Sequence, residues 1–280
     1  WANLTEEENA DMDNRLREGL TIGMLPKIDL HRHLEGSIRP KTLWEIANRK
    51  GIPLPAKRYE DILPYVQYMP GDERTLKCFL QKFHTTRLIL NDAETLSRVT
   101  YEALEDCKAS NSLYAEIRFN PTRMFMMGLS EERIRDGMWQ GILQAKRSLH
   151  MECALICGIA RDLRMDMAER VTAFAATEAG KTMVGIDIFG DESYPSDPFI
   201  PLFQCAKAAG LHITAHAGEA CGSDNVKYAI EDLSAERIGH GVHVVEDDSV
   251  VALARDRGIY FEIVYDVMGF FQFFRAIIRI

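Results

Sequence analysis

Short apolar, β-branched segments alternate with longer amphipathic helical patterns along most of the chain. This alternation is typical of βα units arranged around a parallel sheet. Seven segments have the composition of buried strands, namely 27–33, 113–119, 153–160, 183–190, 212–216, 237–240 and 259–264.

The helical patterns carry recognisable start and stop signals. Ser130 is a good N-cap for a helix over 130–150, and Glu131 and Glu132 put negative charge near the positive end of its dipole. Further helices are expected after Pro40, Ser223 and Glu246. The last of these is closed by Gly258, which suits a left-handed C-cap.

The order of these elements predicts an α/β fold, a (β/α)₈ TIM-type barrel with a helical insertion after the first strand. The insertion covers 34–112 and would lie over the C-terminal mouth of the barrel. An open doubly wound sheet is the alternative, but no glycine-rich phosphate loop follows the first strand. The eighth strand is apparently missing, because the tail after 264 does not continue the pattern.

Composition supports one domain with a sizeable core, since the 280 residues are 46% hydrophobic and 27% charged. We expect residues 1–25 to be an acidic N-terminal extension and 26–280 to be a single barrel domain, incomplete at its C-terminus. A net charge of −9 would repel a phosphate backbone, which favours a small-molecule partner over nucleic acid.

Neither a signal peptide nor an apolar run long enough to span a membrane is visible in the chain. The six cysteines are scattered and form no CxxC pair, which favours core thiols in a reducing compartment. We therefore expect a cytoplasmic protein with no membrane partner.

Four of the eight histidines stand at the ends of three predicted strands: His31 and His33 at the first, His216 at the fifth and His240 at the sixth. Barrel enzymes keep their catalytic groups at these ends. Positions i and i+2 of a strand project to the same side, about 6–7 Å apart. Neutral imidazole is a common zinc ligand, and a catalytic zinc keeps an open position for water. A lone histidine is more often structural, but the HxH pair, His216 and Glu219 together favour a metal site.

Four segments surround these residues: PKIDLHRHLEGSIRP (26–40), GIDIFGDE (185–192), HITAHAGE (212–219) and ERIGHGVHV (236–244). In order and spacing they resemble the motifs of the adenosine deaminase family, zinc-dependent enzymes that hydrolyse the amino group off a purine. The recognisable similarity runs from Pro26 to Ile263.

The resemblance implies that His31, His33 and His216 bind one zinc ion. It also implies that Glu219 donates a proton to purine N1 and that His240 orients the attacking water and stabilises its charge. The chemistry of the residues agrees, because bound zinc lowers the pKa of water from about 15.7 towards about 7. A carboxylic acid with a raised pKa suits protonation of the ring nitrogen.

Two residues are implied to bind the substrate. The backbone NH of Gly190 would bond purine N3, and Glu35 would contact the ribose hydroxyl. Glu35 departs from many adenosine deaminases, which have Asp there, while Glu occurs in relatives that act on free adenine or on larger adenosine-like nucleosides. The IGHG segment (238–241) is more similar to the nucleoside-acting members. We therefore expect deamination of adenosine or a closely related adenine nucleoside, with adenine or a larger nucleoside as the alternative.

Asp187 is equally consistent with support of a ligand histidine and with a structural role.

The family pattern ends with two adjacent aspartates on the eighth strand, and the segment VYDVMGFFQFFRAIIRI (264–280) does not match it. Omitted residues, a frameshift near Val264 or a natural pseudoenzyme would each explain this difference. An inactive purine-binding relative is thus the competing hypothesis from a different functional class. A cytidine-type zinc deaminase is disfavoured, because the HxE and PCxxC pattern is not present.

Overall fold

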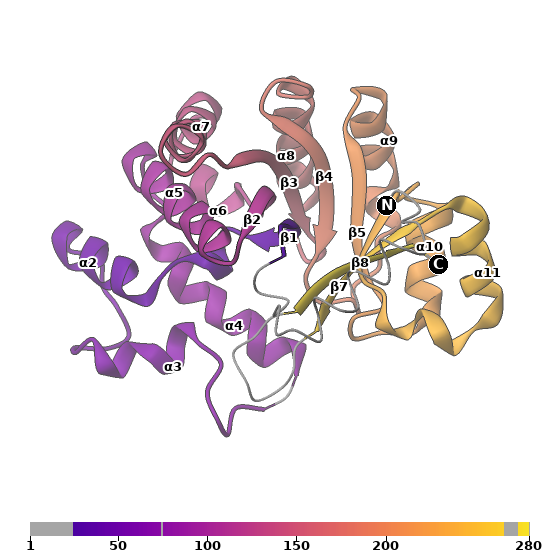
Figure 1. Ribbon diagram of the computed structural model, residues 1–280, viewed down its shortest axis with the longest axis horizontal. Helices are drawn as coiled ribbons and strands as arrows, with labels where there is room; N and C mark the ends of the chain where they lie inside the picture. The colour runs from indigo at the N-terminus through magenta and orange to yellow at the C-terminus, as the bar shows by residue number, and fades with distance from the viewer. Residues whose placement is uncertain (1–24, 74, 266–273, 280) are drawn as a thin grey trace.

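The computed structural model describes residues 25–73, 75–265 and 274–279 (Figure 1). The expected N-terminal extension, apart from Leu25, and most of the tail after 265 lie outside the described residues. The eight strands of the described part form one sheet in chain order, from β1 to β8. Their bounds are β1 Lys27–His33, β2 Ser112–Phe119, β3 Glu152–Ala160, β4 Met183–Phe189, β5 His212–Ala217, β6 Arg237–His240, β7 Tyr260–Tyr265 and β8 Phe274–Arg279.

The first seven strands are parallel to their neighbours and curve into a nearly closed barrel. Sequential strand order is that of a TIM-type barrel and excludes the doubly wound alternative, in which the order reverses. An eighth parallel strand is missing from the residues that the structure describes, as expected. In its place β8 runs antiparallel to β7, with Tyr260 opposite Arg279 and Tyr265 opposite Phe274. Within the described residues no ladder joins β1 to β7 or β8.

Helices cover the outer side of the barrel and fill the insertion after β1. Their bounds are α2 Pro40–Lys50, α3 Leu63–Val66, α4 Leu76–Thr86, α5 Ala93–Ala109, α6 Thr122–Met126, α7 Glu131–Leu149, α8 Met165–Thr177, α9 Ile200–Ala208, α10 Ser223–Glu231 and α11 Asp248–Arg257. Among the described helices none is both long and apolar enough to cross a membrane.

Local sequence explains where several helices begin and end. Pro40 opens α2, where its missing NH costs nothing. The hydroxyl of Ser130 accepts from the backbone NH of Arg133 at the start of α7, as the N-cap signal predicts. Gly258 closes α11 in the left-handed conformation with φ of 65°.

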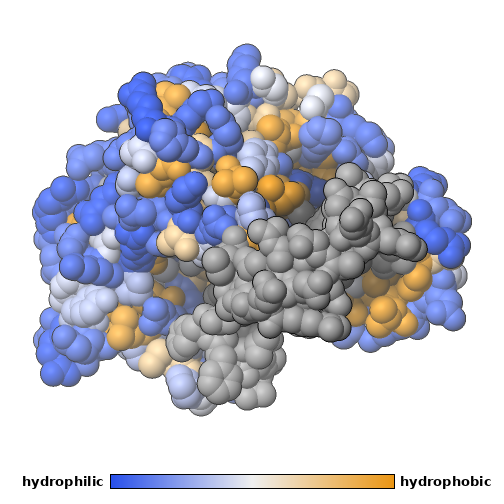
Figure 2. All heavy atoms as spheres, viewed as in Figure 1, coloured by the Kyte–Doolittle hydropathy of each residue, from blue (hydrophilic) through white to orange (hydrophobic). Residues whose placement is uncertain are grey.

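The strands are buried on both faces, as in other barrels with an outer ring of helices. Residues of β3 from Ala154 to Ile159 are all buried, and this stretch reads as an apolar run. The coloured part of the face shown in Figure 2 is mostly hydrophilic. Exposed apolar side chains of the protein include Met126 at the end of α6 and Met127, which follows it.

The inserted helices reach the end of β1. The ring of Phe83 in α4 lies 6.3 Å from the ring of His33, measured between centroids. A Cβ atom added to Gly36 would lie 2.9 Å from the same phenyl ring, so the glycine lets this ring approach closely. The insertion therefore covers part of the barrel mouth, where the first strand ends.

Candidate metal centre and active site

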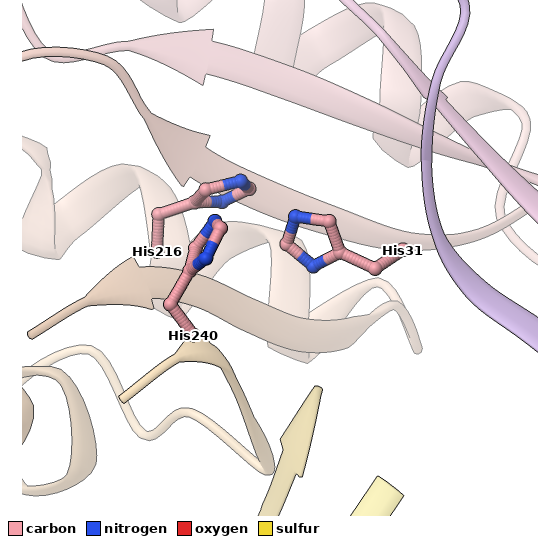
Figure 3. Close-up of side chains that lie close together, drawn as sticks. All are labelled: His31, His216 and His240. Atoms are coloured by element: carbon pink, nitrogen blue, oxygen red, sulfur yellow. The ribbon is translucent and has the colours of Figure 1, made fainter. Parts of the chain in front are cut away.

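The four histidines singled out by the sequence converge at the C-terminal ends of β1, β5 and β6. Figure 3 shows the rings of His31, His216 and His240 facing one another, and one ring nitrogen from each lies within 4.8 Å of the others. His33 joins them, because its Nε2 atom is 3.0 Å from Nε2 of His216. Four imidazoles from three strands thus surround one small volume.

The strand register brings these rings together. His216 of β5 is paired with Gly239 of β6, which in turn is paired with Glu262 of β7. A Cβ atom at Gly239 would lie only 2.8 Å from Cε1 of His31 and 3.4 Å from the ring of His216. A glycine in this row therefore leaves room for the two imidazoles.

Two buried carboxylates orient two of the rings. Nδ1 of His216 lies 3.1 Å from the Asp187 carboxylate, and Nδ1 of His31 lies 2.9 Å from Oε2 of Glu262. A carboxylate beside Nδ1 favours the tautomer that carries its proton there, which leaves Nε2 free to bind a metal. Although burial alone would raise the pKa of Asp187, the nearby His216 and Arg118 outweigh it and hold that pKa below its usual range.

A fully buried cation balances these two carboxylates. Arg118 of β2 places Nη1 2.9 Å from Asp187 and Nη2 2.5 Å from Glu262. Its Nη2 also donates to the carbonyl oxygen of Leu30 at 2.6 Å. Arg237 adds a second contact, with Nε 3.1 Å from Oε1 of Glu262. The carboxylates that orient the histidines are thus compensated in charge.

The imidazoles of β1 are held in the neutral form, which is the form that binds metals. Burial lowers the pKa of His31 well below its usual value, and Arg118 lowers it further. Burial also lowers the pKa of His33, assisted by the neighbouring His216. Neutral nitrogen donors with carboxylate-oriented rings fit a zinc-type ion, and the cluster suggests a metal centre.

Glu219 lies next to His240 of this cluster. Oε1 of Glu219 is 3.5 Å from Nε2 of His240. Burial raises the pKa of Glu219 to about 7, so a large fraction carries a proton at neutral pH. His240 has φ of 67°, which is rare for a residue other than glycine and stores backbone strain at the end of β6.

Glu35 and Gly190 follow β1 and β4. Glu35 is buried, and its Oε1 accepts from the backbone NH of Asn120 at 2.8 Å. Burial raises the pKa of Glu35. Gly190 has φ of 100°, a conformation that requires glycine, and the ring of the preceding Phe189 lies 5.3 Å from that of His33. Gly190 therefore adjoins the histidines, whereas the carboxylate of Glu35 is engaged with the backbone after β2.

The sequence analysis did not single out Arg118, Glu262 or Glu192, all of which are buried here. A usable signal was present, because Arg118 and Glu262 are charged residues inside apolar strand segments. A strand with helices on one side and the barrel interior on the other has no solvent face for such a charge. It must therefore find a buried partner.

Comparison with known proteins agrees with the resemblance found in the sequence. The family model described as adenosine deaminase matches residues 26–265. An adenosine deaminase from Clostridium botulinum (strain Langeland) is 36% identical over 240 residues, which cover 85% of this chain and 71% of that protein.

Two solved structures show a similar fold. The adenine deaminase from Arthrobacter aurescens matches with a TM-score of 0.77 and 27% identity, over 84% of this chain and 71% of that one. An amidohydrolase from Burkholderia ambifaria, solved with bound zinc, matches with a TM-score of 0.75 and 28% identity, over 89% of this chain and 70% of that one.

Proposed function

Because the chain belongs to the adenosine deaminase family and is a hydrolase that deaminates purines, we propose that it converts adenosine, or a closely related adenine nucleoside, to inosine and ammonia with zinc as cofactor. One observation carries the proposal. Four histidines converge at the strand ends beside Glu219, a carboxyl group whose pKa is raised to about 7. The arrangement combines a metal-binding donor set with an acid that is protonated at neutral pH.

His31, His33 and His216 would hold one zinc ion per chain. Their neutral imidazoles and the carboxylates on two of them support this assignment, as does the similar amidohydrolase with bound zinc. Zinc bound there would supply Lewis acidity that makes water a nucleophile at neutral pH.

Glu219 would donate its proton to purine N1, because addition of water to the ring carbon requires the neighbouring nitrogen to gain a proton. His240 lies 3.5 Å from Glu219, and it would orient the water and stabilise its developing charge. The strained backbone of His240 supports a functional role, since such conformations cluster at active sites.

The backbone NH of Gly190 would bond purine N3, and Glu35 would contact the ribose hydroxyl. The similar adenine deaminase favours free adenine as a second candidate substrate, and the engagement of Glu35 with Asn120 agrees with a smaller substrate. A larger adenosine-like nucleoside is the other alternative. The six free cysteines support a cytoplasmic location. The proposed partner is a small-molecule substrate, with neither nucleic acid nor membrane as a partner.

The test is deamination by zinc-supplemented protein, followed through the change in ultraviolet absorbance and the release of ammonia. Adenosine, adenine and a larger adenine nucleoside are compared at equal concentration. We expect the highest kcat/KM for adenosine. Glu219→Gln should lower kcat by about 10²- to 10⁴-fold with zinc still bound, and His216→Ala should lose both zinc and activity.

A higher kcat/KM for adenine than for adenosine would show that the proposed substrate is wrong, while the proposed deamination reaction would stand. Zinc-loaded protein that binds purine and leaves every substrate unchanged would instead support the inactive purine-binding alternative. Full activity in Glu219→Gln would contradict the role of Glu219 as the proton donor.

A further inference from the structure

A buried carboxylate outside the histidine cluster holds the segment that carries Glu219. This segment, residues 218–222, joins β5 to α10 and is called the Glu219 loop below. Glu192 follows β4 and is 4% exposed. Its Oε1 atom accepts from the backbone NH of Glu219 at 3.2 Å, and its Oε2 atom accepts from those of Ala220 at 3.0 Å and Cys221 at 2.7 Å.

These three consecutive amides have a single side chain as their acceptor. Hydrogen bonds between backbone amides and a carboxylate are stronger than those between neutral groups. The backbone of Glu192 is held as well, because its carbonyl oxygen accepts from Nδ2 of Asn225 in α10 at 3.3 Å. Glu192 is thus joined to the Glu219 loop by three hydrogen bonds and to α10 by a fourth.

The loop begins at Gly218, in the left-handed conformation. Gly218 has φ of 66°, and a Cβ atom there would lie 2.7 Å from Cγ2 of Val226. The carbonyl oxygen of Gly218 accepts from the NH of His243 at 3.1 Å. The β5 side of the loop is therefore fixed by strand pairing and this contact, while the direction in which Glu219 leaves the loop depends on the bonds to Glu192.

We propose that Glu192 is a positioning residue, which sets the place of the Glu219 carboxyl group through the three backbone hydrogen bonds of the Glu219 loop. The inference rests on the proposed function, in which Glu219 transfers a proton. Glu192 acts on the reaction only through Glu219, since its own carboxylate is occupied by the amides. A displacement of the reacting group by about 1 Å is enough to lower a rate by about 100-fold.

The experiment compares Glu192→Ala with Glu192→Gln in zinc-loaded, full-length protein. Alanine removes both carboxylate oxygens and with them all three hydrogen bonds, whereas the amide oxygen of glutamine can still accept from Ala220 and Cys221. We expect Glu192→Ala to lower kcat by about 10- to 100-fold with KM changed far less. Glu192→Gln should recover most of kcat.

Glu178→Ala is the matched control for loss of a buried carboxylate. Glu178 is 5% exposed and accepts from the Thr182 hydroxyl at 3.1 Å, at the end of α8. This variant should lose stability and leave kcat unchanged. If Glu178→Ala and Glu192→Ala lower kcat equally, Glu192 has only a structural role and the proposal fails.

A double variant tests whether Glu192 acts through Glu219. In the Glu219→Gln background, Glu192→Ala should cause little further loss of kcat, because residues that act as a unit are not additive. An equal loss in both backgrounds would overturn the proposal.

Hydrogen exchange of the backbone amides over 218–222 gives a readout that needs no turnover. Exchange should be faster in Glu192→Ala than in the wild type and close to wild type in Glu192→Gln. Unchanged exchange in Glu192→Ala overturns the proposal even if the enzyme is active. Conversely, wild-type protein without any turnover contradicts the proposed function, while the exchange result still decides whether Glu192 holds the loop.

Discussion

Glu262 carries a negative charge into the barrel interior, where it is 2% exposed. Arg118, Arg237 and the imidazole of His31 all contact its carboxylate. A buried ion pair contributes little net stability, but removal of one partner leaves the other charge uncompensated. Glu262 therefore links the stability of the barrel to the orientation of a proposed metal ligand.

Glu262→Ala should lower the free energy of unfolding by about 3–5 kcal/mol. It should also weaken zinc binding by roughly 10- to 100-fold, because His31 loses the group that orients its ring. Urea unfolding of the metal-free protein and chelator competition measure the two effects separately. Glu262→Gln keeps an acceptor for Nδ1 of His31, so we expect smaller losses in zinc affinity.

Glu152→Ala is a suitable contrast for this variant. The ion pair between Glu152 and Lys146 is solvent-exposed, and exposed pairs contribute about 0–1 kcal/mol to the free energy of unfolding. Comparable destabilisation by Glu262→Ala and Glu152→Ala would contradict the importance of the buried charge network.

At the scale of elements, two helices approach closely through glycines. Gly137 and Gly141 of α7 face α5, and Cβ atoms there would lie 2.8 Å from the Ala93 carbonyl oxygen and 2.4 Å from that of Ser97. Both obstacles are backbone atoms, which cannot turn away as a side chain could. The packing of the insertion against the helix after β2 therefore depends on the lack of a side chain at these positions.

Whether Gly141→Ala raises or lowers the free energy of unfolding tests this packing. Alanine is favoured over glycine by about 1 kcal/mol in a helix, so an uncrowded site would become more stable. We expect destabilisation by about 1–3 kcal/mol instead, because the methyl group forces α5 and α7 apart. Thermal or urea unfolding measures the change, and zinc content should be unaffected. Gln140→Ala, on an exposed position of the same helix, is the control and should stay near the wild type.

On the scale of the whole molecule, the histidine cluster connects metal binding and pH to stability. In the folded protein His31 is buried and His33 is half-buried, and desolvation lowers the pKa of both, while the pKa of histidines in the unfolded chain is near 6.5. As the pH falls below about 6.5, the unfolded chain takes up protons that the folded protein resists, so stability falls. Zinc bound only to the folded state adds about 4 kcal/mol when its free concentration is 1,000 times Kd.

Chelation should therefore lower the melting temperature at neutral pH, and acidification from pH 7.5 to 5.5 should lower it further in the metal-free protein. Calorimetry with and without chelator at both pH values measures the two effects. His33→Gln should abolish most of the chelator effect. His212→Gln should retain it, because the side chain of His212 is 68% exposed and pairs with Glu236. A chelator effect of equal size in both variants would place the metal elsewhere.

Much of the barrel could be predicted from the sequence, because strands and helices report local patterns. The seven expected strands agree with the observed bounds to within one residue at every end, and 237–240 matches β6 Arg237–His240 at both ends. Ser130 and Gly258 marked helix ends through contacts with their immediate neighbours. The histidines stood out in the same way, since their place at a strand end is visible in the chain itself.

Only the tertiary structure decided which charges meet. His31 and Glu262 are 231 positions apart, and His216 and Asp187 are 29 apart, so no local pattern relates them. The antiparallel direction of β8 depends in the same way on pairing with β7. Glu192 could not be linked to the Glu219 loop before β4 and β5 were placed side by side. The sequence thus determined the strands and helices and the metal-binding and charged side chains that they carry. The strand register in the folded protein determined which of these side chains meet. Residues paired across a sheet can be any distance apart along the chain, so local sequence patterns do not reveal them.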